Sequence, residues 1–194
     1  MYMSHQSRWQ KEASKASAHQ IKAFVDFYHT NMDEFQPSNL SEHSTFDDFF
    51  VRRHAVGSRP IFAESDPSKT VVVADSRVVV YRISIAGSLD QGGNNFTIGN
   101  LILNVERAKL WADGGVASFR LSPQDYHHYH SPVAGKVRCF KQITGDYYQF
   151  DPICLISNVD ILTRNARRCI VIETKEFGMV LFVAIGATEV GTVE

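Results

Sequence analysis

The chain has 194 residues, of which 44% are hydrophobic and 21% charged, and these proportions are typical of a globular protein rather than a disordered one. Its 20 basic and 21 acidic residues nearly cancel, so no strong positive field indicates a nucleic-acid partner. The longest apolar run, Met179 to Ala187, has about half of the roughly 18 residues that a membrane-spanning helix needs. The first residues also lack the apolar stretch of a signal peptide, so we expect neither kind of segment.

The cysteine pattern argues against two common kinds of site. Cys139, Cys154 and Cys169 are odd in number and widely spaced, without a C-x-x-C pair. Disulfide frameworks and structural zinc sites usually need paired or clustered cysteines. We therefore expect three free thiols in a reducing compartment.

Helical patterns occupy the first part of the chain. Residues 1–19 are polar and form a lead-in. Residues 20–36 repeat apolar side chains at three- to four-residue spacing, which predicts an amphipathic helix that Pro37 ends. A threonine followed by acidic residues is typical of a helix N-cap, so a second, short helix is predicted from Thr45 to Arg53.

Short runs rich in β-branched residues, separated by glycines, follow the helices. They predict strands at residues 71–73, 78–83, 119–121, 135–140, 169–173 and 179–185. The last two flank a Lys-Glu-Phe-Gly turn that is suited to a hairpin. The expected fold class is α+β, with N-terminal helices followed by a mainly antiparallel β domain over residues 20–194. Strand-like sequence continues to Glu194, so we expect this domain to be incomplete at its C-terminus.

Residues 119–135, FRLSPQDYHHYHSPVAG, carry the densest group of reactive side chains. The Ser-Pro pair suits the start of a helix, while Pro132 favours extended geometry at the residue before it. One helical turn is therefore predicted between about residues 123 and 129. Such a turn would bring His127 and His130 to one face.

Three interpretations of His127, His128 and His130 stay open. They could be ordinary surface or core histidines. A zinc site would need three converging ligands, and their spacing lacks the H-x-x-x-H pattern that aims two ligands from one helix. Imidazole also moves protons near neutral pH, so acid–base catalysis is the third interpretation.

Two other regions allow both a structural and a functional interpretation. Asp75, at the end of an apolar run, could bond its own backbone in a turn, or it could orient a histidine as the acid of a Ser-His-Asp triad does. The aromatic and basic region formed by residues 46–53 and 59–61 fits packing beside a solvated basic face. Four phenylalanines could belong to the core or to an apolar patch that faces a membrane: Phe24, Phe27, Phe49 and Phe50.

Taken in order, these regions resemble the phosphatidylserine decarboxylase family, in particular its fungal-type branch. The resemblance is carried by TFDDFFVRR at 45–53, SRPI at 58–61, VADSR at 73–77, FRLSPQDYHHYHSPVAG at 119–135, GDYY at 145–148 and IGATEVGT at 185–192. The Arg-Leu-x-Pro-x-Asp-Tyr-His-x-x-His-x-Pro string is the most specific of these. The resemblance covers the chain from about Ile21 to its end.

The resemblance implies a proenzyme that cleaves itself at a Gly-Ser bond and converts the freed serine to an N-terminal pyruvoyl group. That group would form a Schiff base with the substrate amine and accept electrons as CO2 leaves, turning phosphatidylserine into phosphatidylethanolamine. By resemblance, His130 is the base that activates the serine, Asp75 orients His130, and His127 reprotonates the product. His128 stands where the family often has Arg, and it receives no role.

The sequence lacks the Gly-Ser-Thr string at which the family cleaves itself. We therefore expect the serine to lie beyond Glu194, on a small pyruvoyl-bearing α chain, and we expect this chain alone to be inactive. The resemblance also implies a membrane surface, mitochondrial or endomembrane, and is compatible with a homodimer. Two alternatives stay open: a pyruvoyl-dependent decarboxylase of free aromatic amino acids such as tryptophan, and a non-catalytic remnant that binds lipid or a partner.

Overall fold

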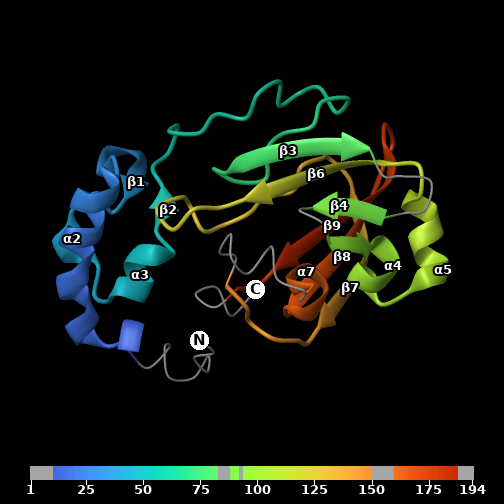
Figure 1. Cartoon of the computed structure of the whole chain (residues 1–194). Coiled ribbons are helices and arrows are strands. Elements are labelled where there is room, and N and C mark those ends of the chain that lie inside the picture. The colour runs from blue at the N-terminus through green and yellow to red at the C-terminus, as the bar shows by residue number, and fades with distance from the viewer. Residues whose placement is uncertain (1–10, 83–87, 92–93, 150–159, 188–194) are drawn as a thin grey trace. The chain divides into compact units, whose positions relative to one another are not determined.

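The computed structural model describes residues 11–82, 88–91, 94–149 and 160–187, and Figure 1 shows its helices and strands. The chain divides into two compact units. One, here called the histidine unit, comprises residues 6–79 and 118–133 and contains the three clustered histidines. The other, the sheet unit, comprises residues 80–117 and 134–194 together with Met1–His5. The expected single domain over residues 20–194 stays a prediction.

Short helices make up much of the histidine unit. In chain order they are η1 Lys15–Ala18, α2 His19–Tyr28, η2 Met32–Glu34, η3 Leu40–Glu42 and α3 Phe46–Phe50. Two very short strands, β1 Phe35–Gln36 and β2 Arg53–His54, pair antiparallel. The Phe24 ring of α2 lies 5.3 Å and 5.7 Å, between centroids, from the rings of Phe46 and Phe49 in α3. Aromatic packing therefore joins the two helices.

The predicted helix over residues 20–36 is wrong in its second half. Helix α2 ends at Tyr28 because His29 adopts a left-handed conformation, with φ 53°, which breaks the helical bonding. Asn31 then caps the separate turn η2 by accepting a hydrogen bond from the Asp33 amide. The short helix α3 confirms the second helix prediction, and the Thr45 side chain caps it by accepting from the Asp48 amide at 3.0 Å. Of the four phenylalanines, Phe49 is fully buried and Phe27 is 75% exposed.

Strands β3 Arg77–Arg82 and β6 Gly115–Arg120 form a two-stranded sheet. They confirm the strands predicted at 78–83 and 119–121, apart from their exact ends; Ile83 lies outside the described residues. The strand predicted at 71–73 is wrong, because this segment belongs to no ladder. It is instead held by two backbone hydrogen bonds, from the Val71 amide to the Pro132 carbonyl (3.0 Å) and from the His130 amide to the Val73 carbonyl (2.7 Å).

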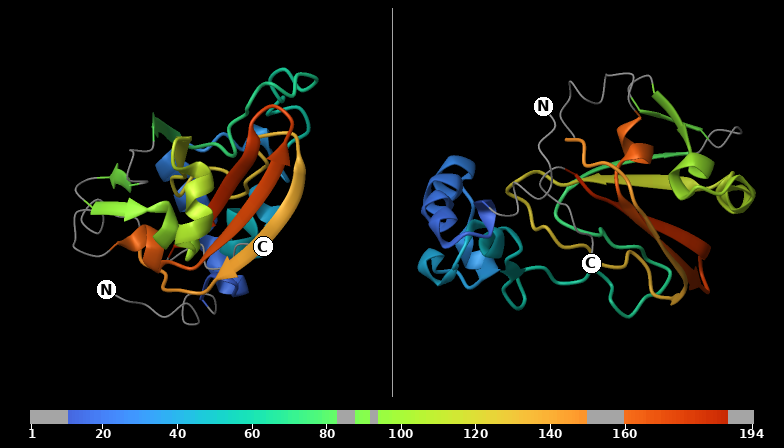
Figure 2. Two further views of the ribbon diagram at one scale, coloured as in Figure 1. Left: turned by 90° about the vertical axis from the view of Figure 1, so that its right-hand side faces the viewer. Right: turned by 90° about the horizontal axis from the view of Figure 1, so that it is seen from below.

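The sheet unit is built on a three-stranded antiparallel sheet in the order β7-β8-β9. Its strands are β7 Lys136–Ile143, β8 Arg167–Thr174 and β9 Gly178–Ile185, and they confirm the last three predicted strands and the hairpin turn between β8 and β9. Helix α4, Ile98–Ile102, covers one face of this sheet (Figure 2) and contributes two members of its buried core. That core comprises Ile98, Ile102, Ile143 and Cys169.

Several small elements of the sheet unit were not predicted. They are the hairpin of β4 Ser88–Gln91 and β5 Asn94–Thr97, the helices α5 Val105–Ala108 and α7 Ile161–Arg164, and the turn η4 Lys109–Trp111. Helix α4 was not predicted either. The combination of short helices with antiparallel sheets nevertheless confirms the α+β fold class.

Cys139 and Cys169 are free thiols, the second of them buried, whereas Cys154 lies outside the described residues. Burial raises the pKa of the Cys169 thiol. Among the helices that the structure describes, none is both long and apolar enough to cross a membrane.

Candidate active site

The segment that carries the histidines begins with a tight turn and not with the predicted helical turn. The Asp125 amide donates to the Ser122 carbonyl at 2.9 Å, and the Asp125 carboxylate accepts from the Ser122 amide at 2.7 Å. The Asp125 side chain thus satisfies the Ser122 amide within the turn, which competes with helix formation. Residues 126–130 are not helical. The expected shared helical face of His127 and His130 is therefore absent.

Each of the three histidines has a different environment. The His127 ring stacks on Phe50 with centroids 3.9 Å apart, and its Nε2 lies 3.2 Å from the Pro123 carbonyl. The His128 Nε2 lies 2.8 Å from the Val51 carbonyl just after α3. His130 is exposed, and its Nε2 lies 3.3 Å from a tyrosine hydroxyl, that of Tyr126.

Tyr126 links this segment to strand β2. Its buried ring lies against the His54 ring, with centroids 4.0 Å apart, and runs nearly parallel to the His130 ring at 5.7 Å. Burial raises the pKa of the Tyr126 phenol, so the neutral hydroxyl is retained over a wider pH range. Tyr126 can therefore share a proton-carrying hydrogen bond with His130 without ionising.

The buried Arg52 also binds the segment that carries the histidines. Its guanidinium donates to the Gln124 carbonyl at 2.7 Å and to the Phe49 carbonyl at 3.3 Å, and it lies over the rings of Phe35 and Phe49. Burial lowers the pKa of Arg52 to about 10, which still leaves it charged at neutral pH. This residue fixes the turn at 122–125 against helix α3.

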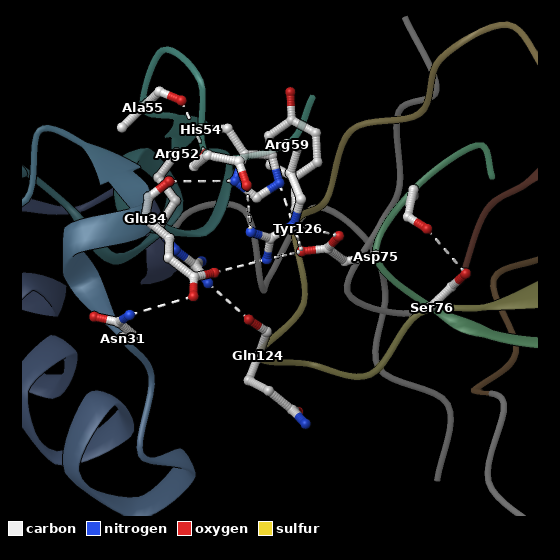
Figure 3. A network of polar contacts seen from close by, with 12 residues as sticks. Asn31, Glu34, Arg52, His54, Ala55, Arg59, Asp75, Ser76, Gln124 and Tyr126 are labelled. Atoms are coloured by element: carbon white, nitrogen blue, oxygen red, sulfur yellow. Dashed lines mark hydrogen bonds and ion pairs between the residues drawn. The ribbon is translucent and has the colours of Figure 1, made fainter. Parts of the chain in front are cut away.

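Asp75 follows two buried residues, Val73 and Ala74, and its carboxylate sits in a polar network (Figure 3). Arg59 Nε donates to Oδ1 at 2.9 Å and to Oδ2 at 3.2 Å, and Arg59 Nη2 donates to Oδ2 at 2.8 Å. The Nε2 of His54 lies 3.5 Å from the same Oδ2. The hydrogen bond from Arg59 holds the pKa of Asp75 below its usual range, against the opposing effect of partial burial. Asp75 is therefore an ionised carboxylate at neutral pH.

The described contacts do not include a hydrogen bond between the side chains of Asp75 and His130, so their expected pairing stays a prediction. The chain does bring them to neighbouring segments, because the His130 amide donates to the carbonyl of Val73, two residues before Asp75. The roles expected for His127, His130 and Asp75 in catalysis likewise stay predictions.

Sequence reasoning gave no role to three residues around Asp75: Glu34, His54 and Arg59. Arg59 lies within the SRPI string that contributed to the family resemblance, and His54 directly follows the TFDDFFVRR string. Neither position carries a periodic or spacing signal that would point to a carboxylate distant in sequence. Within the ranges that the structure describes, no group of three His, Cys, Asp or Glu side chains is arranged to hold a metal ion.

This arrangement supports proton transfer. It combines an ionised carboxylate, an exposed imidazole and a neutral tyrosine hydroxyl within one compact unit. Imidazole can take up and return a proton near neutral pH, and a carboxylate can stabilise the imidazolium that forms.

Comparison with known proteins places the chain in a family. The family model of phosphatidylserine decarboxylase matches residues 46–194. The chain is 37% identical over 184 residues to phosphatidylserine decarboxylase proenzyme 2 of Komagataella phaffii, covering 93% of this chain and 18% of that protein. It is 37% identical over 183 residues to proenzyme 3 of Schizosaccharomyces pombe, covering 94% and 19%. With the proenzyme of Clostridium novyi it shares 33% identity over 181 residues, covering 93% of this chain and 60% of that protein. The chain thus spans about a fifth of the two fungal relatives and three-fifths of the bacterial one.

Proposed function

Because the chain belongs to the phosphatidylserine decarboxylase family, we propose that it supplies the acid–base residues of an enzyme that converts phosphatidylserine to phosphatidylethanolamine and CO2. The family match carries this proposal, since it includes both Asp75 and the three clustered histidines. The histidine unit adds support, because these residues, far apart in sequence, belong to one compact body.

In the proposed enzyme His130 acts first, as the base of self-cleavage. It takes the proton from the hydroxyl of the serine at the cleaved Gly-Ser bond, and the ionised Asp75 stabilises the resulting imidazolium. The exposure of His130 suits a base that must meet a residue from another segment. No Gly-Ser-Thr string occurs in the sequence, so the proposal assigns the serine to a segment outside these 194 residues.

His127 acts in the second stage, as the acid that returns a proton to the product carbon. Its ring is stacked on Phe50 and its Nε2 lies near the Pro123 carbonyl, so two neighbours hold its orientation. A fixed ring orientation favours proton delivery to one atom of the substrate.

The chemistry of the side chains fits a pyruvoyl group made from a serine. When present, that group supplies an electron-withdrawing carbonyl that stabilises the charge left as CO2 departs. In this chain, His130 and Asp75 would serve its formation, and His127 would lie beside it. Phosphatidylserine is anionic and carried by a membrane, so the proposal also includes a membrane surface as the place of reaction.

The proposal is tested by expressing the full natural reading frame that contains this chain and measuring intact masses under denaturing conditions. We expect two chains, the smaller one with an N-terminus blocked by pyruvate, and release of CO2 from phosphatidylserine in vesicles. A single uncleaved chain that releases no CO2 would refute the proposal.

Free tryptophan serves as the comparison substrate in the same assay. The relatives reported above are named as phosphatidylserine decarboxylase proenzymes, and the comparisons give no support to the aromatic amino acid alternative. We expect turnover of phosphatidylserine and none of tryptophan. Turnover of tryptophan alone would overturn the proposed substrate while leaving the decarboxylase chemistry in place.

A further inference from the structure

Arg59 is held by acceptors from three places in the histidine unit. Its Nη2 donates to Glu34 Oε2 at 2.7 Å, and its Nη1 donates to the Ser58 carbonyl at 3.0 Å. Its Nε and Nη2 together grip both oxygens of Asp75 (Figure 3). A guanidinium is planar, so bonds on several of its nitrogens fix the orientation of the whole group.

The hydrogen bonds from Arg59 leave the Asp75 carboxylate able to accept a further hydrogen bond. A carboxylate oxygen can accept about two hydrogen bonds. Oδ2 accepts hydrogen bonds from Arg59 Nη2 and Nε and also lies 3.5 Å from His54 Nε2. Among the described residues, the contact of Oδ1 is the single hydrogen bond from Arg59 Nε. Oδ1 can therefore accept a further N–H, such as that of a histidine ring, while Arg59 remains bound.

The charges around Asp75 favour its ionised form. Glu34 and Asp75 are both negative, Arg59 is positive, and the pKa of Glu34 is lowered chiefly by its hydrogen bond from Arg59. The two carboxylates in turn raise the pKa of Arg59, so the guanidinium stays charged throughout the physiological range. Arg59 therefore separates two like charges and favours the charged form of each.

We propose that Arg59, oriented by Glu34, is a positioning residue for Asp75, and that it fixes the carboxylate in an orientation that leaves Oδ1 able to pair with the histidine base. This inference rests on the proposed function, because that function gives Asp75 its role. Arg59 touches neither the cleaved bond nor the substrate in this scheme. It acts through the angle and the ionisation of the Asp75 carboxylate.

An exposed ion pair often contributes little, so the proposal needs a matched control. The chain offers one in the sheet unit, where Arg138 binds Glu173 across strands β7 and β8. The side chains of this pair are 47% and 42% exposed, close to the 42% and 37% of Arg59 and Glu34. Arg138→Ala removes a comparable arginine that has no contact with Asp75.

The experiment uses the full-length proenzyme and measures the first-order rate of self-cleavage as a function of pH. For Arg59→Ala we expect a cleavage rate about 10- to 100-fold lower at neutral pH, because the catalytic carboxylate is misplaced. We also expect the fall of the rate at acidic pH, which reports protonation of Asp75, to begin at a higher pH. Arg59→Lys keeps the charge but cannot bind both carboxylate oxygens through two nitrogens. It should therefore restore the pH at which the rate falls more fully than it restores the rate itself. Arg138→Ala should stay within about twofold of the wild type.

A second measurement separates this inference from the proposed function. The carboxyl pKa of Asp75 can be followed by NMR in the 194-residue chain, where no cleavage is required. Arg59→Ala and Glu34→Gln should each raise that pKa, and Arg138→Ala should not. An unchanged Asp75 pKa in Arg59→Ala, or a wild-type pH profile of cleavage, would overturn the inference. A wild-type proenzyme that does not cleave itself would instead count against the proposed function, while the NMR result would still decide whether Arg59 fixes Asp75.

Discussion

Two neighbouring histidines, His128 and His130, differ in what their rings can do. The His128 Nε2 lies 2.8 Å from the Val51 carbonyl, so this ring is occupied in tying the segment to the end of α3. The exposed His130 ring contacts a hydroxyl that can itself give or accept a proton. The first environment suits a structural contact and the second suits proton transfer.

Alanine at position 128 should affect mainly stability, and alanine at position 130 should affect mainly catalysis. His130→Ala should slow self-cleavage of the full-length proenzyme by on the order of 100- to 10,000-fold, because a general base is lost. His128→Ala should retain cleavage and lower the free energy of unfolding by about 1 kcal/mol, the usual contribution of one hydrogen bond. Cleavage is followed by mass and stability by denaturant titration. Equal cleavage rates in the two variants would contradict the assignment of the base.

Asp75 should also make the stability of the chain depend on pH. Its pKa is lower in the folded chain than in the unfolded one, chiefly because of the hydrogen bond from Arg59. The stabilisation is therefore fully present above the unfolded pKa of about 4 and is lost as pH falls through the folded value. In Asp75→Asn, the loss of unfolding free energy between about pH 6 and pH 3 should be smaller than in the wild type. Denaturant titrations at the two pH values measure this, and an identical loss would contradict it.

Single residues also mark the limit of sequence reasoning. The Asp-Tyr-His-x-x-His string could be recognised in the sequence because its residues are close together in the chain. Arg59 lies 16 residues before Asp75 in the chain, and Glu34 lies 25 residues before Arg59, so only the folded backbone brings the three side chains together. No local propensity encodes such a contact, so this part of the network could not be predicted.

Among the elements, helix α3 shows how far a local signal can reach. Thr45 caps it through the Asp48 amide, Asp47 and Asp48 occupy its first turn, and Phe49 and Phe50 are buried from its far end. These are sequence-adjacent effects, so the helix could be predicted. The turn at 122–125 begins with a similar Ser-Pro-x-Asp pattern, yet the Asp125 carboxylate bonds back to the Ser122 amide and no helix follows.

Removing the cap of α3 should have a moderate and measurable cost. Thr45→Ala should lower the free energy of unfolding by about 1 kcal/mol, because the Asp48 amide loses its acceptor. Thr45→Ser keeps a hydroxyl and should recover most of that loss. Denaturant titration of the three chains at neutral pH provides the measurement. A Thr45→Ser variant as unstable as Thr45→Ala would show that the methyl group, and not the hydrogen bond, carries the effect.

At the scale of the whole molecule, the histidine unit is discontinuous in sequence. Residues 118–133 return to it after the chain has passed through part of the sheet unit. That return supplies the acceptor for Arg52 Nη2, the ring that packs on His54, and both backbone bonds to the 71–73 segment. Helix and strand patterns predict elements one at a time, so they could not reveal that the histidine segment completes a unit begun near the N-terminus.

This connectivity leads to a prediction about a fragment of residues 6–79. The fragment contains Asp75, Arg59 and Glu34, but it lacks every partner that residues 118–133 provide. The buried Arg52 would lose its Gln124 acceptor, and two ring contacts, of Phe50 with His127 and of His54 with Tyr126, would be lost. We therefore expect the fragment to lack the cooperative thermal unfolding that near-UV circular dichroism should detect in the 194-residue chain. A fragment that unfolds cooperatively at the midpoint of the intact chain would show that residues 118–133 dock on an already stable body, and the histidines would then lie on an added segment and not within the core of the unit.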